Sequence, residues 1–167
     1  MKHRPYAVCS ALAVLLSMGA VCMPAMAAVT VTFVQPERFR DLPFSPIERA
    51  QVLKELGEHM VQLNKLLPPG QDLAIEVIDL DMAGRIVPNF RAGQDLRVMR
   101  GGADWPHMQL RYRLSVNGQQ MAAGEEQLRD MAYLERINRY SDGDSLRYEK
   151  RMVDDWFQNK FAPGHKG

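Results

Sequence analysis

Two aspartates, Asp79 and Asp81, are separated by a single residue and could act together in chemistry. On a strand, both carboxylates would point to the same side, about 7 Å apart. A glycine follows, as in a calcium-binding loop, but such a loop also needs oxygen ligands where Ala83 and Phe90 stand. We therefore predict that the pair ends a strand, caps backbone N–H groups or binds nearby arginines. The alternative is a divalent-metal site for a metal-dependent hydrolase, built from four carboxylates: Asp79, Asp81, Glu126 and Asp130.

A second acidic group consists of Glu125, Glu126 and Asp130. Arg111 and Arg113 stand on the strand predicted to pair with this segment, so cross-strand ion pairs are the simpler interpretation. A glutamate that pointed inward would need a partner, or burial would raise its pKa. A carboxyl group with a raised pKa could serve as a general acid, which is the alternative for this group.

Arginines are concentrated in the middle of the chain, and Trp105 stands among them beside His107. Guanidinium groups next to an exposed indole could bind a small anionic ligand or a partner protein. The residues predicted to form this binding site are Trp105, Arg97, Arg100 and Arg111. The competing interpretation is a solvated face on which Trp105 folds against the core, because large aromatic side chains are usually mostly buried.

The sequence contains no recognisable motif for covalent or cofactor chemistry. It has no Gly-x-Ser-x-Gly motif and no phosphate-binding glycine loop after a strand. His59, His107 and His165 show no metal-ligand spacing. We therefore expect no cofactor. Enzymatic activity stays uncertain, and a non-enzymatic binding protein is favoured over the metal-dependent hydrolase.

The first 27 residues predict a secretory signal peptide. Lys2 and Arg4 precede an apolar run over residues 7–21, and Ala25-Met26-Ala27 forms a small-x-small cleavage site. Cleavage would leave residues 28–167 as a single domain without a transmembrane segment. The predicted location is the periplasm.

Cleavage would also remove both cysteines, Cys9 and Cys22, so no disulfide is expected. Loss of Lys2 and Arg4 would lower the net charge of +1 by two. A chain so close to neutrality has no bulk attraction to nucleic acid or to anionic lipid. The expected partner is therefore a periplasmic protein or a small anionic ligand.

The hydrophobic pattern predicts two main helices. The first begins where Ser45 and Glu48 form a capping box, and it ends before Pro68. Its apolar stripe is Ile47, Ala50, Leu53, Leu56, Met60, Leu63 and Leu67. The second helix covers residues 146–161 with a wide apolar face rich in aromatic residues. A shorter helix is expected over residues 132–140.

Alternating apolar and polar residues predict the strands. They are expected over residues 29–33, 73–82, 95–99 and 108–116. Asn117-Gly118 predicts a tight hairpin into a return strand. Reversals in the alternation predict two bulges, one near Ile78 and one near Gly124. The order of elements predicts an α+β fold, with a largely antiparallel sheet and two main helices packed on one face.

Short segments along most of the chain carry a family resemblance. They are Pro36-Glu37, Phe39, Asp41, Leu67-Pro68-Pro69-Gly70-Gln71, Leu73, Ile75-Glu76-Val77, Asp79, Asp81, Ala83-Gly84, Arg97-Val98-Met99-Arg100, Asp104-Trp105-Pro106, Leu110-Arg111-Tyr112, Gly124-Glu125-Glu126, Leu128, Asp130-Met131, Tyr133-Leu134, Tyr148-Glu149-Lys150-Arg151-Met152 and Asp155-Trp156-Phe157. Together they resemble the uncharacterised secreted bacterial proteins of the domain-of-unknown-function 3016 family. The resemblance implies a Gram-negative periplasmic setting, and it supplies no catalytic residues.

Overall fold

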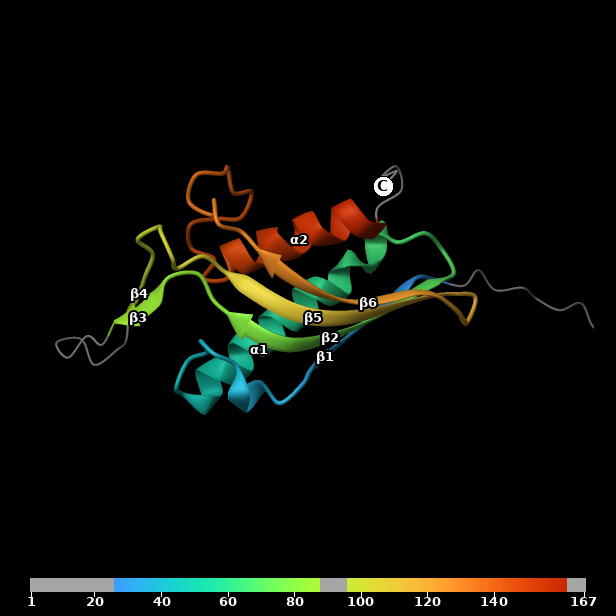
Figure 1. Ribbon diagram of the computed structural model, residues 1–167, viewed down its shortest axis with the longest axis horizontal. Coiled ribbons are helices and arrows are strands. Elements are labelled where there is room, and N and C mark those ends of the chain that lie inside the picture. The colour runs from blue at the N-terminus through green and yellow to red at the C-terminus, as the bar shows by residue number, and fades with distance from the viewer. Residues whose placement is uncertain (1–25, 88–95, 162–167) are drawn as a thin grey trace, which may run out of the picture.

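A four-stranded sheet with the order β1-β2-β5-β6 forms the centre of the protein (Figure 1). The structure, a computed structural model, describes residues 26–87 and 96–161. The strands of the sheet are β1 (Ala28–Phe33), β2 (Gln71–Asp81), β5 (His107–Val116) and β6 (Gln119–Arg129). The other elements are α1 (Pro46–Gln62), α2 (Arg147–Phe161), a small sheet of β3 (Arg85–Val87) and β4 (Leu96–Val98), and the 3-10 turns η1 (Pro36–Arg38) and η2 (Leu63–Leu66).

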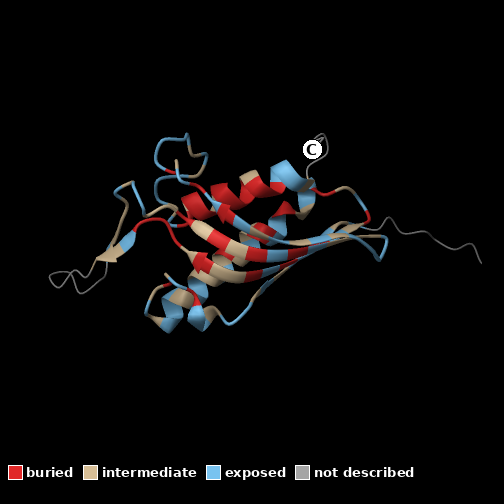
Figure 2. Ribbon diagram, viewed as in Figure 1, coloured by how far each residue is buried: buried red, intermediate tan, exposed pale blue. Residues whose placement is uncertain are grey.

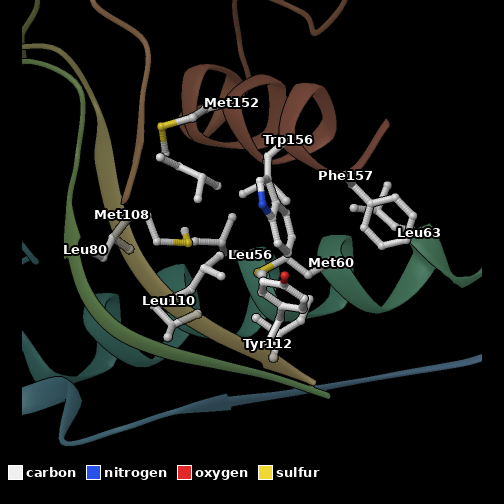
Figure 3. Packing of buried hydrophobic residues seen from close by; sticks show 14 of the residues in the cluster. Leu56, Met60, Leu63, Leu80, Met108, Leu110, Tyr112, Met152, Trp156 and Phe157 are labelled. Atoms are coloured by element: carbon white, nitrogen blue, oxygen red, sulfur yellow. The ribbon is translucent and has the colours of Figure 1, made fainter. Parts of the chain in front are cut away.

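The predicted α+β fold is confirmed. β1 runs parallel to β2, and the pairings of β2 with β5, β5 with β6 and β3 with β4 are antiparallel. Both helices pack on one face of the large sheet and enclose the main core with it (Figure 3). Leu56 and Met60 of α1 and Phe157 of α2 meet Leu110 of β5 there, and all four side chains are fully buried.

The first helix begins at the predicted residue. The burial of its first turn and the geometry of its last turn differ from the prediction. Ser45 Oγ accepts a hydrogen bond of 3.4 Å from the N–H of Glu48, which caps α1. The predicted stripe is wrong at Ile47, which is 81% exposed, and at Ala50, which is also exposed, because the start of the helix does not reach the core (Figure 2). The last predicted turn is the 3-10 turn η2 rather than α-helix.

The bulge predicted near Ile78 is confirmed. The pairing of β2 with β5 shifts register between Val77 and Asp79, so one extra residue stands on β2. The shift keeps Leu80 in the core, fully buried, although it breaks the alternation set by Val77. Asp79 and Asp81 consequently point to the face of the sheet that the helices do not cover.

The hairpin between β5 and β6 forms at the predicted turn, where Asn117 and Gly118 have φ of 50° and 80°. The second bulge lies at a different place from the prediction. The register shifts at Met121, directly after the turn, and not near Gly124. Glu125 and Glu126 are therefore regularly paired. A Cβ on Gly124 would lie 3.0 Å from the Tyr112 ring. Glycine is therefore needed at this position because the Tyr112 side chain lies so close, and not because of a bulge.

The short helix predicted over residues 132–140 is wrong, because this segment forms turns. Two of its carbonyl groups, those of Tyr133 and Arg136, accept hydrogen bonds of 2.8 Å from the guanidinium of Arg151 on α2. Because the Arg151 side chain satisfies these two carbonyl groups, they need no hydrogen bonds from N–H groups of a helix. The strand predicted over 95–99 is confirmed as β4.

No helix in the described part of the chain is long and apolar enough to cross a membrane. The predicted signal peptide, residues 1–27, lies almost wholly outside the described residues, as do Cys9 and Cys22.

Candidate functional site

A cleft of about 530 Å³ opens beside Trp105, where β2 leads into β3 and β5 begins. Asp81 and His107 from the ends of these strands line it, together with Arg100. We call it the Trp105 cleft. Trp105 and His107 also border a smaller depression of about 260 Å³, which Asp79 lines. Of the aspartate pair singled out in the sequence, Asp81 therefore lines the larger hollow and Asp79 the smaller one.

The two aspartates end β2 and have different partners. Asp79 accepts hydrogen bonds from the N–H groups of Leu80 and Arg40, and its carboxylate lies 3.1 Å from Arg40 Nε. Asp81 lies 3.5 Å from His107 Nε2, and partial burial raises the pKa of its carboxyl while His107 opposes the rise. The prediction of a strand end with an arginine partner is confirmed for Asp79, whereas Asp81 has a histidine instead.

Ala83 directly precedes Gly84, which lines the cleft, and two side chains hold its backbone. Arg97 Nη1 donates to the carbonyl of Ala83 at 3.2 Å and to Asp41 at 2.6 Å. Glu149 accepts the N–H of Ala83 at 2.7 Å from the opposite side. Within the described residues, Arg97 Nη2 and Glu149 Oε2 have no hydrogen-bond partner. Arg97 thus fixes the backbone next to the cleft without lining it.

The wall of the cleft is fixed by hydrogen bonds around Asp104. Its carboxylate accepts the Tyr133 hydroxyl and the N–H of Arg100, both at 2.9 Å. Desolvation would raise the pKa of the Asp104 carboxyl, but these hydrogen bonds outweigh it and lower the pKa. Burial and Asp104 raise the pKa of Tyr133 to about 12, so its hydroxyl stays a donor. Trp105 packs partly buried on Tyr133 and Tyr148, which leaves part of its ring facing the cleft.

Of the four residues predicted to bind a ligand, the structure brings two together. Trp105 and Arg100 both line the cleft. Arg97 does not line the cleft, and its side chain is only 17% exposed. Arg111 lies elsewhere, on the open face of the sheet, where it forms the predicted cross-strand ion pair with Glu125 at 2.9 Å. Arg111 shares the open face with His107 and Asp81, but it stands four residues beyond His107 on β5 and lines a different depression, so it lies outside the Trp105 cleft.

The four carboxylates of the alternative metal site do not converge. Asp79 and Asp81 lie on the open face of the sheet. Glu126 points to the helix-covered face, where it accepts from Trp156 Nε1 at 2.8 Å, and Asp130 pairs with Arg151 at 2.6 Å. Across residues 26–87 and 96–161, no three His, Cys, Asp or Glu side chains are placed to hold a metal ion.

Sequence reasoning missed a group of buried charged residues on α2, which we call the α2 charges: Glu149, Arg151 and Asp154. Asp154 is fully buried and accepts hydrogen bonds from His59 of α1 at 2.8 Å, and from Arg139 and Tyr140. A signal was present in the pattern of α2. Glu149 stands three residues after Leu146 and four before Val153, so a charge interrupts the apolar stripe.

Replacing Glu149 with glutamine is expected to stabilise the protein at neutral pH. Burial raises the pKa of the Glu149 carboxyl above its ordinary value of 4.5. A group with a raised folded-state pKa favours folding below 4.5, and this contribution is lost as pH rises through the folded value. A tenfold difference in proton affinity of this carboxyl between the folded and unfolded states corresponds to about 1.4 kcal/mol in the free energy of unfolding. Urea unfolding at acidic and neutral pH measures the difference.

Glu125→Gln is the matched control, because hydrogen bonds from Arg111 and Gln109 lower the pKa of this exposed carboxyl. Its pH dependence should have the opposite sign. A Glu149→Gln variant that is destabilised equally at both pH values would contradict the prediction, since the carboxylate charge would then be needed by Arg97.

The sequence profile of one family matches the chain over residues 27–159. Its description reads "Protein of unknown function (DUF3016)". No curated protein matches the chain. The matched range takes in the whole sheet, the Trp105 cleft and nearly all of α2. The chain therefore belongs to the DUF3016 family.

Proposed function

We propose that the protein is a non-enzymatic periplasmic binding protein that takes a small anionic ligand in the Trp105 cleft. The observation that carries the proposal is a partly exposed indole held beside Arg100 on a loop that Asp104 and Tyr133 fix. A fixed indole and a nearby guanidinium suit a ligand with a carboxylate or phosphate group and a flat or apolar body.

The cleft is lined by three carboxylates, those of Asp41, Asp81 and Asp104, and by the guanidinium groups of Arg85 and Arg100. Asp41 is paired with Arg97 at 2.6 Å, and Asp104 is satisfied by the Tyr133 hydroxyl and the N–H of Arg100. Within the described residues, no carboxylate forms an ion pair with the guanidinium of Arg100. Its positive charge is therefore available to an incoming ligand, whereas Asp41 and Asp104 are already engaged and Asp81 lies 3.5 Å from His107 Nε2.

Removing the Arg100 side chain is expected to weaken anion binding about tenfold or more, because a hydrogen bond to a charged group contributes about 1.5–3 kcal/mol. Fluorescence titration in a Trp156→Phe background isolates Trp105, since the sequence holds two tryptophans. The probes are inorganic phosphate, glycerol phosphate, galacturonate and a short acidic peptide. The peptide represents the other predicted partner, a protein.

Arg111→Ala is the matched control, because it removes the same side chain from the open face of the sheet. The proposal expects a saturable change of fluorescence that Arg100→Ala and Trp105→Phe weaken or alter and Arg111→Ala leaves intact. Equal losses in both arginine variants would contradict the assignment of the site. A panel without any saturable response would contradict anion binding itself.

A further inference from the structure

The two edges of the large sheet are built differently. β6 forms one edge and carries charged residues, Glu125, Glu126 and Arg129, as well as the bulge at Met121. Such features hinder pairing with another chain. β1 forms the other edge with the sequence AVTVTF, which has no charge, no proline and no bulge. Within the described residues only β2 pairs with it, so the β1 edge is unprotected.

The backbone of β1 leaves every second residue with its hydrogen-bonding groups directed outward. Val34 donates its N–H to the carbonyl of Val77 on β2 at 2.9 Å. Alternate residues of a strand point their backbone groups to the same side. The N–H and C=O groups of Val29, Val31 and Phe33 therefore point away from β2, toward the open edge.

An apolar groove of about 560 Å³ runs beside this edge, between β1 and α1. Half-buried Val31 and Phe33 line it from the strand, and Leu53, Gly57 and Val61 line it from the helix. A Cβ on Gly57 would lie 3.3 Å from the ring of Phe33, so the glycine allows the ring to lie close against the helix. Val61 keeps 40% of its side chain exposed. The groove offers apolar surface to whatever pairs with β1.

We propose that this surface binds a second copy of the chain, with β1 paired antiparallel to the partner's β1 about a two-fold axis at Val31. In this register Val29 faces the partner's Phe33, and Thr30 faces the partner's Thr32. Apolar residues thus meet apolar residues on the helix-covered face, and threonines meet on the open face. The pairing uses the outward N–H and C=O groups of β1 and extends the sheet across both copies.

The charges beside the groove are self-complementary. Lys54 and Glu58 stand one helical turn apart on the groove side of α1, where they form a loose ion pair of 3.9 Å with each other and stay 72% and 62% exposed. A two-fold axis perpendicular to the sheet makes the two α1 helices antiparallel on the same face. Lys54 of one copy then comes to Glu58 of the other, and the contact is repeated by symmetry. A strand from a different protein could pair with β1 without this arrangement of charges. The arrangement therefore favours a second copy of the chain.

Sedimentation of the purified protein from micromolar to millimolar concentration tests the proposal. We expect a monomer–dimer equilibrium in which Lys54→Glu raises the dissociation constant about tenfold or more, because like charges then meet twice. The double variant Lys54→Glu with Glu58→Lys restores opposite charges and should restore the dimer. Lys65→Glu makes the same charge change on the exposed surface of η2, outside the groove, and should leave the dimer unchanged.

Val31→Pro tests the strand pairing, because it removes an outward N–H and keeps the hydrogen bonds to β2. We expect loss of the dimer with a native circular dichroism spectrum. If this variant does not fold, the charge-reversal series decides by itself. A protein that stays monomeric at every concentration would overturn the proposal. So would a dimer that all these variants leave unchanged, or one that the double variant fails to restore.

Discussion

Replacing Asp154 with alanine is expected to lower the free energy of unfolding by about 3–5 kcal/mol. The carboxylate is fully buried and accepts hydrogen bonds from His59, Arg139 and Tyr140. Its removal leaves the side chains of His59 and Tyr140 without their partner and separates α1, α2 and the turn segment that carries Tyr140. Urea unfolding at neutral pH, followed by circular dichroism, measures the loss.

Asp155→Ala is the matched control on the same helix. Asp155 pairs with Arg136 at 2.6 Å, but its side chain is 35% exposed, so its loss should cost about 1 kcal/mol or less. Equal losses in the two variants would contradict the special role of Asp154.

The same carboxylate gives a pH dependence of known sign. Desolvation would raise the pKa of Asp154, but hydrogen bonds from His59, Tyr140 and Arg139 outweigh it and lower the pKa below the ordinary value of 3.8. A group with a lowered folded-state pKa stabilises the fold above its ordinary value, and this contribution is lost as pH falls. The difference in stability between the protein and Asp154→Ala should therefore shrink in acid.

Replacing Arg151 with alanine is the second large effect, again about 3–5 kcal/mol. Its guanidinium pairs with Asp130 at 2.6 Å, with side chains 4% and 5% exposed. It also donates to the carbonyls of Tyr133 and Arg136 at 2.8 Å. Alanine would leave Asp130 buried with only the weaker contact to Arg136 at 3.6 Å and would release the turn segment over residues 132–140.

Urea unfolding measures this loss, with Arg111→Ala as the control. Arg111 also pairs with a carboxylate, Glu125, but both side chains are about half exposed, so its loss should cost at most about 1 kcal/mol. A double-mutant cycle with Asp130→Asn separates the ion pair from the carbonyl contacts. If Arg151→Ala costs no more than Arg111→Ala, the assigned role of the buried pair is wrong.

Local patterns in the sequence were sufficient for most elements. The capping residue Ser45, the Asn117-Gly118 turn and the bulge near Ile78 each depend on residues adjacent in the chain, and all three are confirmed. The second bulge was predicted wrongly at Gly124, because this glycine leaves room for the ring of Tyr112 on the neighbouring strand and does not mark a bulge. Ile47 was placed in the core because periodicity does not show where the sheet beneath a helix ends.

The candidate site could be predicted only in part. Trp105 and Arg100 are close in sequence and share a loop, so their meeting at the cleft followed from position alone. Arg97 and Arg111 could be separated from them only by the tertiary structure, in which Arg97 is bound to Asp41 and the carbonyl of Ala83, and Arg111 lies four residues beyond His107 on β5, outside the cleft. The division of the four acidic residues between the two faces of the sheet likewise required the register.

By itself, the sequence determined the fold class, the order of elements and the family, because hydrophobic period, turn chemistry and short motifs are properties of neighbouring residues. Only the tertiary structure decided which charges are internal. Glu149, Arg151 and Asp154 read as ordinary helix residues, yet each holds a segment distant in the chain: Ala83, the turns after β6, and α1. Burial of a charge depends on partners brought together by folding, and no local pattern specifies those partners.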